Sequence, residues 1–137
     1  MIAVIRSRFN EDITGMLLNG CINELREKQV SYDLFECPGS VESVGLSKKI
    51  ANSSKYKAII VIGAIIKGDT DHYEYVCQYV TNGLSAVSTQ IDIPLVFGIL
   101  TTQTEELALV RADEAQMNKG KEFAETAIEM IGVFQKI

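Results

Sequence analysis

The segment best suited to carry chemistry is residues 63–72, GAIIKGDTDH, which leads from an apolar run into a helical pattern. Backbone amides at such a turn bind anions, and the hydroxyl of Thr70 adds a further hydrogen-bonding group. His72 is the single histidine of the chain, and histidine is the common proton-transfer group near neutral pH. A lone histidine is also often a structural or surface residue, so the residues alone leave both interpretations open. The spacing of a Walker phosphate loop is absent.

Two further segments follow expected strands. Residues 7–10 read SRFN, and the ring of Phe9 either belongs to the core or stands exposed to stack on a planar ligand. Residues 38–42 read PGSVE, which is typical of a turn followed by a helix start. The same residues suit a polyhydroxylated ligand, because free backbone amides lie there beside the carboxylate of Glu42. On local sequence alone the simple turn is favoured.

Two basic residues near the C-terminal end are candidates for binding an anion. Arg111 ends a short expected helix, and Lys119 lies in the turn MNKG at residues 117–120. Arginine suits bidentate contact with a phosphate, and lysine supplies a point charge. Each is otherwise a solvated surface charge, which is the usual situation of such residues. Together these segments indicate an α/β enzyme that handles a small anionic ligand, without naming the substrate.

Alternating strand and helix patterns must position these segments. Apolar runs predict strands at residues 2–5, 32–37, 58–66 and 95–100. Apolar residues at three- and four-residue spacing predict helices at residues 13–25, 41–51, 72–89 and 118–134. TQTE at residues 102–105 reads as a capping box that opens a further short helix. The order predicts an α/β fold, a three-layer αβα sandwich with a four-stranded parallel sheet in the flavodoxin-like order 2-1-3-4.

Two details of these helices are specific enough to be checked. Asn10 or Asp12 is expected to cap the N-terminus of the first helix. Five side chains of the third helix are expected to face a core, namely Tyr75, Val76, Tyr79, Leu84 and Val87. In a parallel sheet of this kind ligands bind beyond the carboxyl ends of the strands, which is where the candidate segments lie.

The composition restricts the class of protein. The chain has 137 residues, 47% of them hydrophobic and 23% charged, which predicts a single globular domain over residues 1–137. The net charge is −5 and the largest basic cluster is Lys48-Lys49, which argues against a nucleic-acid partner. Three cysteines without a CxxC spacing argue against a disulfide framework and a zinc site. With no signal peptide and no apolar run of membrane-spanning length, a cytoplasmic protein is expected.

Five blocks along essentially the whole chain resemble the lumazine synthase family. RFN at residues 8–10 resembles the family's opening motif, and PGSVE resembles its PGAFE motif. GAIIKGDTDHYEYVC at residues 63–77 resembles GAVIRGxTxHxxYVC, and FGILTT at residues 97–102 resembles FGVLTT. Arg111-Ala112 and NKG at residues 118–120 resemble the family's RAG and NKG pair. Five blocks in the right order and spacing are a specific signal, whereas a single block would be weak.

The resemblance implies a reaction in riboflavin biosynthesis. It is the condensation of 5-amino-6-ribitylaminouracil with 3,4-dihydroxy-2-butanone 4-phosphate to 6,7-dimethyl-8-ribityllumazine, without a metal or an organic cofactor. His72 would be the general acid/base. Phe9 would stack on the pyrimidine, Glu42 would bind the ribityl hydroxyls, and Arg111 would bind the phosphate. The substrate-binding residues that the resemblance implies are Phe9, Ser40, Val41, Glu42, Gly63, Ala64, Ile65, Gly68, Asp69, Thr70, Phe97, Arg111 and Lys119.

The resemblance also implies an assembly. In the family the counterparts of Phe97, Arg111 and Lys119 reach the site of a neighbouring subunit, so a homo-oligomer is required. The family's basic unit is a cyclic pentamer, and residues 111–120 carry no insertion of the kind that blocks a sixty-subunit shell. A sixty-subunit shell is therefore expected. The expected partners of the chain are further copies of itself, its two small-molecule substrates and riboflavin synthase.

The chain departs from the family pattern at six positions, among them Ser43-Val44, where Ile-Pro is usual. Val41 stands where an aromatic is usual and removes an apolar wall from the pyrimidine pocket, Ser40 stands for Ala, Asp69 for a small residue, and Asp113 for Gly. Two alternatives compete with lumazine synthase: an archaeal-type riboflavin synthase, which shares this fold, and a non-catalytic lumazine- or flavin-binding shell protein. His72 together with the PGxxE and NKG blocks favours lumazine synthase.

Overall fold

A computed structural model describes residues 1–137 and contains one sheet of four parallel strands. The strands are β1 (Ile2–Ser7), β2 (Tyr32–Cys37), β3 (Ala58–Ile66) and β4 (Leu95–Thr102). Their spatial order is β2-β1-β3-β4 and every neighbouring pair is parallel. This confirms the predicted flavodoxin-like sheet.

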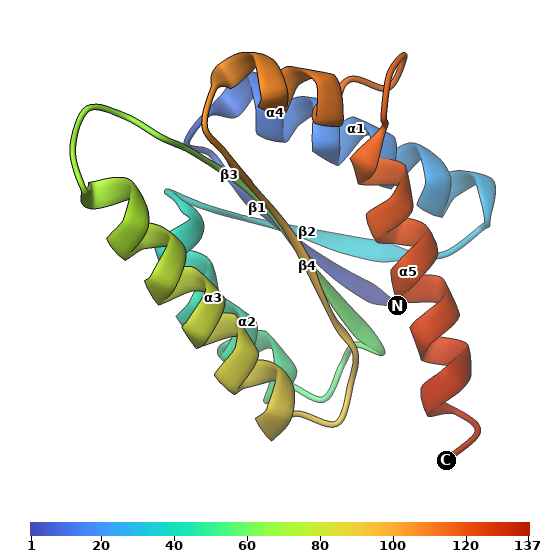
Figure 1. The fold of residues 1–137 in the computed structure, drawn as a ribbon. Coiled ribbons are helices and arrows are strands. Elements are labelled where there is room, and N and C mark those ends of the chain that lie inside the picture. Colours follow the sequence, from blue (N-terminus) through green and yellow to red (C-terminus); the bar gives the residue numbers. More distant parts are fainter.

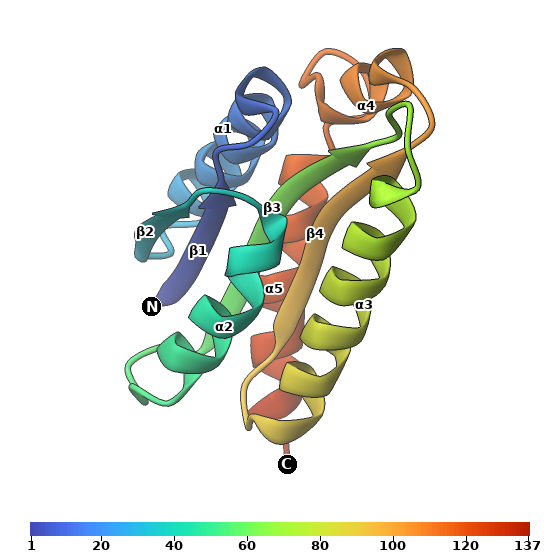
Figure 2. The same ribbon diagram turned by 90° about the vertical axis from the view of Figure 1, so that its left-hand side faces the viewer.

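Five helices cover the two faces of the sheet (Figure 1). They are α1 (Glu11–Glu27), α2 (Ser40–Ala51), α3 (His72–Gln90), α4 (Glu105–Ala112) and α5 (Lys119–Phe134). Figure 2 shows α2 and α3 in front of the sheet, with α1, α4 and α5 behind it. The molecule is therefore the predicted three-layer αβα sandwich. None of the helices combines the length and apolarity that a membrane span requires.

Each face of the sheet has its own apolar core, because successive side chains of a strand point to opposite faces. On one face Val4 and Ile60 pack with apolar residues of α1 and α5. On the other face Ile5 and Val61 pack with apolar residues of α2 and α3. The six residues of β1 are all buried, and so are eight of the nine residues of β3. The two central strands thus form a rigid support for whatever follows their carboxyl ends.

The capping box predicted at residues 102–105 is wrong. Thr102 still belongs to β4, where it pairs with Ile66, so the helix begins later. Thr104 is the N-cap residue of α4, and its hydroxyl accepts a hydrogen bond from the backbone N–H of Leu107 at 3.2 Å. The sheet pairing of β4 therefore extends over the residue that the local pattern assigned to the helix start.

The predicted core face of α3 is partly wrong. Tyr75 and Tyr79 are 69% and 56% exposed, whereas Val80, Leu84 and Val87 are buried. The buried stripe is thus displaced by one position from the two tyrosines. An apolar pattern identifies a helix more reliably than it identifies which of two neighbouring positions faces the sheet.

Candidate active site

A cavity of about 390 Å³ lies at the carboxyl ends of β1, β2 and β3. The turn after β1, the start of α2, the end of β3 and the first turns of α3 form its walls. This is the edge of a parallel sheet at which ligands bind. The lining residues are Phe9, Gly39, Ser40, Val41, Glu42, Ala64, Ile65, Ile66, Gly68, Thr70, His72, Tyr73 and Val76.

The ring of Phe9 is 70% exposed at the edge of this cavity, so it is not a core residue. Its turn is held by three neighbours. The backbone N–H groups of Arg8 and Phe9 donate to the carbonyls of Cys37 and Pro38 at 2.9 and 3.0 Å. The Asn10 side-chain amide donates to the carbonyl of Ala64 at 2.8 Å. A large apolar ring is thus presented to solvent on a fixed backbone, which is the arrangement needed for stacking.

The start of α2 presents free backbone donors beside a carboxylate. Gly39 is the N-cap residue and provides no side-chain cap, so side chains leave the first amides of α2 unbonded. A Cβ placed on Gly39 would lie 3.5 Å from Glu42 Oε1 and 3.8 Å from Phe9 Cβ. The Glu42 carboxylate and the Phe9 ring therefore lie close to the same turn. Donors and acceptors of this kind suit a hydroxylated chain.

Asn10 begins α1 in the left-handed conformation, with φ of 58°, and makes no side-chain cap bond. Its side-chain amide donates to the carbonyl of Ala64 instead. Of the two predicted N-cap residues, Asn10 therefore occupies the N-cap position but makes no capping hydrogen bond, and Asp12 lies within the helix. The Asn10 side chain thus links the turn after β1 to β3 and does not cap α1.

Gly63 lies beneath the cavity and not in its lining. A Cβ on Gly63 would overlap Ser40 Oγ and lie 3.3 Å from Ser7 Oγ. Its missing side chain allows the start of α2 to close onto β3. The next two residues, Ala64 and Ile65, line the cavity as predicted for substrate-binding positions.

The segment between β3 and α3 brings Gly68, Thr70 and His72 to the cavity. His72 is exposed, and its backbone N–H donates to Thr70 Oγ1 at 3.3 Å. The helix start therefore lies directly beside the loop that the sequence marks as an anion site. Asp69 is exposed but is absent from the lining, so its carboxylate lies outside this part of the site.

Four lining residues were not among the predicted site residues: Gly39, Ile66, Tyr73 and Val76. Val76 follows His72 by four positions and Tyr73 by three, so that it lies beside both residues on the surface of the first helical turns. That helical spacing was the available signal. Burial, with Cys77 next to it, raises the pKa of the Tyr73 phenol. Tyr73 and Val76 together with Val41 form an apolar wall of the cavity.

Besides Gly63 and Asp69, three further predicted residues do not line the cavity of this chain: Phe97, Arg111 and Lys119. Phe97 lies on the edge strand β4 and is 43% exposed. Arg111 lies in the last turn of α4, where its Nη1 donates to the carbonyl of Leu107 at 2.9 Å. Lys119 begins α5 and pairs with Glu122 at 3.2 Å. One chain therefore brings His72 together with the predicted residues that follow β1, β2 and β3, and it leaves Phe97, Arg111 and Lys119 outside the cavity.

The chain matches the family model described as 6,7-dimethyl-8-ribityllumazine synthase over residues 1–135. It is 41% identical over 139 residues to the 6,7-dimethyl-8-ribityllumazine synthase of Coxiella burnetii (strain Dugway 5J108-111), covering 99% of this chain and 92% of the relative. The enzyme of that name from strain RSA 493 / Nine Mile phase I is 40% identical, with the same coverage. The chain belongs to the 6,7-dimethyl-8-ribityllumazine synthase family.

Membership in the lumazine synthase family makes the chain a transferase of riboflavin biosynthesis, and the cavity is its candidate active site. No group of three or more His, Cys, Asp or Glu side chains is arranged to hold a metal ion. Val41, the departure from the aromatic of the motif, is half-buried and lines the cavity. The lost ring therefore changes the wall of this cavity directly.

Cys37 lies beneath the site, and its thiol is in surroundings that make it unreactive. Its thiol is 3.9 Å from Ser7 Oγ and donates to the carbonyl of Gly39 at 3.3 Å. Burial is the main cause that raises the pKa of the Cys37 thiol, and the nearby Glu42 carboxylate acts in the same direction. A thiol kept protonated is a poor nucleophile, so Cys37 supports the turn and is not a candidate for covalent catalysis.

Proposed function

We propose that the protein forms 6,7-dimethyl-8-ribityllumazine by condensing 5-amino-6-ribitylaminouracil with 3,4-dihydroxy-2-butanone 4-phosphate. The observation that carries this proposal is that four groups meet in one cavity. They are an exposed aromatic ring, a free helix start with a carboxylate, an anion-type loop and a histidine. These groups match the planar ring, the hydroxylated chain, the phosphate and the proton transfers of the two substrates in turn.

The pyrimidine ring stacks on Phe9, with Val41 on the cavity wall. The amides at Ser40 and Val41 and the carboxylate of Glu42 bind the ribityl hydroxyls. Gly68 and Thr70 bind the phosphate. Asp69 lies outside the lining and adds a negative charge to the same loop. These roles are supported by the position of each group at the cavity or its rim.

His72 moves protons during imine formation, phosphate elimination and ring closure. Its exposed position beside Thr70 supports this role, since the group must exchange protons with bound substrate. Placing two substrates side by side lowers a barrier by roughly 7–11 kcal/mol, whereas one acid/base group contributes about 10²–10⁴-fold in rate. Positioning is thus the larger contribution, and the enzyme retains measurable activity without His72.

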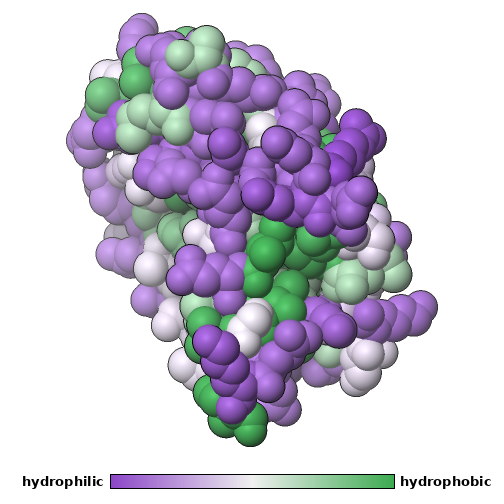
Figure 3. Space-filling model, turned by 90° about the vertical axis from the view of Figure 1, so that its right-hand side faces the viewer, coloured by the Kyte–Doolittle hydropathy of each residue, from purple (hydrophilic) through white to green (hydrophobic).

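Phe97, Arg111 and Lys119 act in the site of a neighbouring copy, where Arg111 completes the phosphate site. Exposed apolar side chains on α4, its following turn and the end of α5, namely Leu107, Val110, Met117, Val133 and Phe134, support burial against other copies. Apolar atoms also gather in a hollow on the face shown in Figure 3. We propose a cyclic pentamer, its assembly into a sixty-subunit shell, and association with riboflavin synthase.

Three free cysteines support a reducing, cytoplasmic location.

The test is a turnover assay with both substrates, following product absorbance and fluorescence together with phosphate release. Equal amounts of lumazine and phosphate should be formed only when both substrates are present. Conversion of lumazine alone to riboflavin would instead indicate a riboflavin synthase. Tight lumazine binding without turnover would indicate a non-catalytic binding protein.

A further inference from the structure

A buried arginine lies beneath the turn that carries Phe9. Arg6 is only 9% exposed and belongs to β1, whose other side chains, except that of Ser7, are buried aliphatic groups. An apolar side chain would satisfy the core at this position. A charge in such surroundings is costly unless it is fully hydrogen-bonded, so its partners indicate what it is held for.

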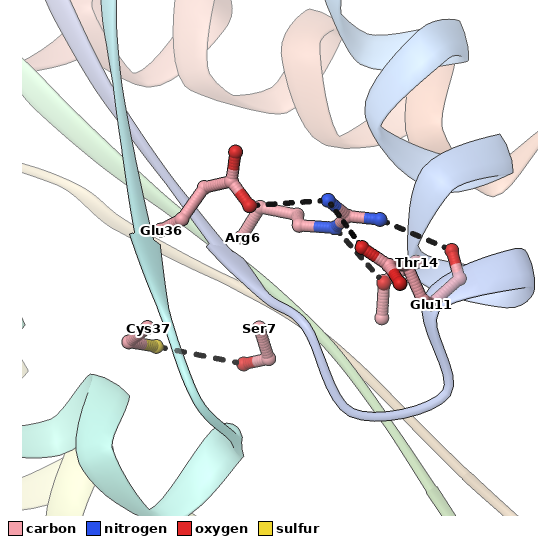
Figure 4. A network of polar contacts seen from close by, with 6 residues as sticks. All are labelled: Arg6, Ser7, Glu11, Thr14, Glu36 and Cys37. Carbon is pink, nitrogen blue, oxygen red and sulfur yellow. Dashed lines mark hydrogen bonds and ion pairs between the residues drawn. The ribbon is translucent and has the colours of Figure 1, made fainter.

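The guanidinium contacts two elements at once (Figure 4). Toward α1 its Nε donates to Thr14 Oγ1 at 3.1 Å and its Nη2 to the carbonyl of Glu11 at 3.1 Å. Toward β2 its Nη1 donates to Glu36 Oε2 at 3.2 Å. Nη1 also lies 3.7 Å from Glu11 Oε1. Every nitrogen of the guanidinium therefore has a partner.

These contacts close the turn at both of its supports. Residues 8–10 lie between Arg6 and Glu11, so the bond to the Glu11 carbonyl ties the two ends of the turn together. Glu36 precedes Cys37 and Pro38, whose carbonyls accept the amides of the turn. The start of α1 lacks a side-chain cap of its own. Arg6 is thus the one side chain that joins β1, the start of α1 and the end of β2 around Phe9.

We infer that Arg6 is a positioning residue, which holds the turn so that the Phe9 ring stands ready to stack on the pyrimidine substrate. Arg6 is absent from the cavity lining and acts only through Phe9. The inference rests on the role proposed above for Phe9. A stacking ring that is already fixed before binding loses less conformational entropy when the ligand arrives.

The kinetic test compares Arg6→Met with Arg26→Met. Arg26 also joins α1 to β2, through Tyr32 Oη at 3.3 Å, but at the opposite end of β2 from Phe9. Arg6→Met should raise KM for the pyrimidine about 3- to 10-fold through loss of ordered stacking, with kcat and KM for the sugar phosphate changed less than about twofold. Arg26→Met should leave all three unchanged, and Arg6→Lys should restore part of the pyrimidine KM. A lower Tm for Arg6→Met with an unchanged pyrimidine KM would overturn the inference.

A double-mutant cycle tests whether Arg6 acts through Phe9. In a Phe9→Ala background Arg6→Met should add no further increase in pyrimidine KM, whereas independent effects would multiply. Multiplying effects would overturn the inference while the role of Phe9 stands. An unchanged pyrimidine KM in Phe9→Ala alone would refute the role of Phe9 itself, and with it the stacking purpose of Arg6.

A spectroscopic readout is independent of activity. The chain contains no tryptophan, so Phe9→Trp places a single indole on the turn. Adding Arg6→Met should lower the steady-state anisotropy of that indole and the amplitude of the slow component of its anisotropy decay, while Arg26→Met should leave both unchanged. Equal anisotropy with and without the Arg6 guanidinium would overturn the claim that Arg6 orders the turn.

Discussion

The carboxyl edge of the sheet differs on its two sides. Beyond β1, β2 and β3 one chain encloses a cavity with a ring, a helix start, an anion-type loop and His72. On the side of β4, Phe97 of that strand and Arg111 of α4 lie outside this cavity, and Lys119 of α5 pairs with Glu122. The first side can hold a ligand. The groups of the second side do not reach the cavity of their own chain. This difference supports the proposed shared site, in which one copy builds the pocket and a neighbouring copy supplies its missing charges.

The largest effect is expected on the cavity side, from His72→Ala. We expect kcat to fall about 10- to 100-fold, at the low end of acid/base contributions, because positioning of both substrates is retained. His72 contributes its backbone N–H, and not its imidazole, to the hydrogen bond with Thr70 Oγ1, so thermal stability and assembly should not change. Steady-state kinetics and light scattering measure both quantities. An unchanged kcat would remove the histidine from the mechanism.

A smaller effect of a different kind is expected on the other side, from Arg111→Ala. The substitution should raise KM for the sugar phosphate about tenfold, the size of one charge-assisted hydrogen bond. The single hydrogen bond of Arg111 lies within its own helix, so the fold should tolerate the change. Arg26→Ala, an exposed arginine on α1, is the control and should have no effect on KM. If only the pyrimidine KM moves, Arg111 does not bind the phosphate.

Restoring the usual aromatic sharpens the account of the cavity wall. Val41→Phe should tighten pyrimidine binding by about 1 kcal/mol, roughly fivefold, from added apolar contact. The cavity also contains Tyr73 and Val76 beside this position, and both could crowd a new ring. Calorimetric titration of the pyrimidine measures the change. Weaker binding would mean that the pocket is built around the smaller residue.

The smallest effect on activity is expected from a buried residue away from the site, whose influence is on stability at high pH. Burial raises the pKa of the Cys21 thiol from 9.0 to about 12. The unfolded chain therefore loses this proton first, and the resulting stability is present below about pH 9 and is lost as the pH rises toward 12. The slope is at most about 1.4 kcal/mol per pH unit. Urea unfolding of Cys21→Ala should show a shallower alkaline decline than the parent protein, and equal slopes would contradict this.

Much of the fold was predictable because its signals are local. The apolar runs of β1 and β3 and the helical spacing along α1 follow from neighbouring residues, and the parallel topology follows from their alternation. Phe9 and His72 were located because ligands bind at strand ends. The limit of α4 was missed because it depends on the pairing of Thr102 with Ile66, which no local pattern contains.

The missed parts of the site are likewise set by contacts between distant residues. Arg6 meets Glu36, 30 positions away, and Asn10 meets Ala64, 54 positions away. Tyr73 and Val76 line the cavity because of how α3 is rotated on the sheet, a property that spacing alone does not fix. In the proposed shared site, Phe97 and Arg111 act on a second copy, and the packing of one chain does not specify where that copy lies.

The most direct test of a site shared between copies is complementation. His72→Ala and Arg111→Ala chains, carrying different affinity tags, are co-expressed and purified through both tags, so that only mixed assemblies are measured. If each site takes His72 from one copy and Arg111 from its neighbour, about a quarter of the sites in an even mixture contain both intact residues. At sugar-phosphate concentrations below KM, the mixed assembly should recover about a quarter of the parent activity by this count. An activity equal to the mean of the two separate variants would contradict the shared site.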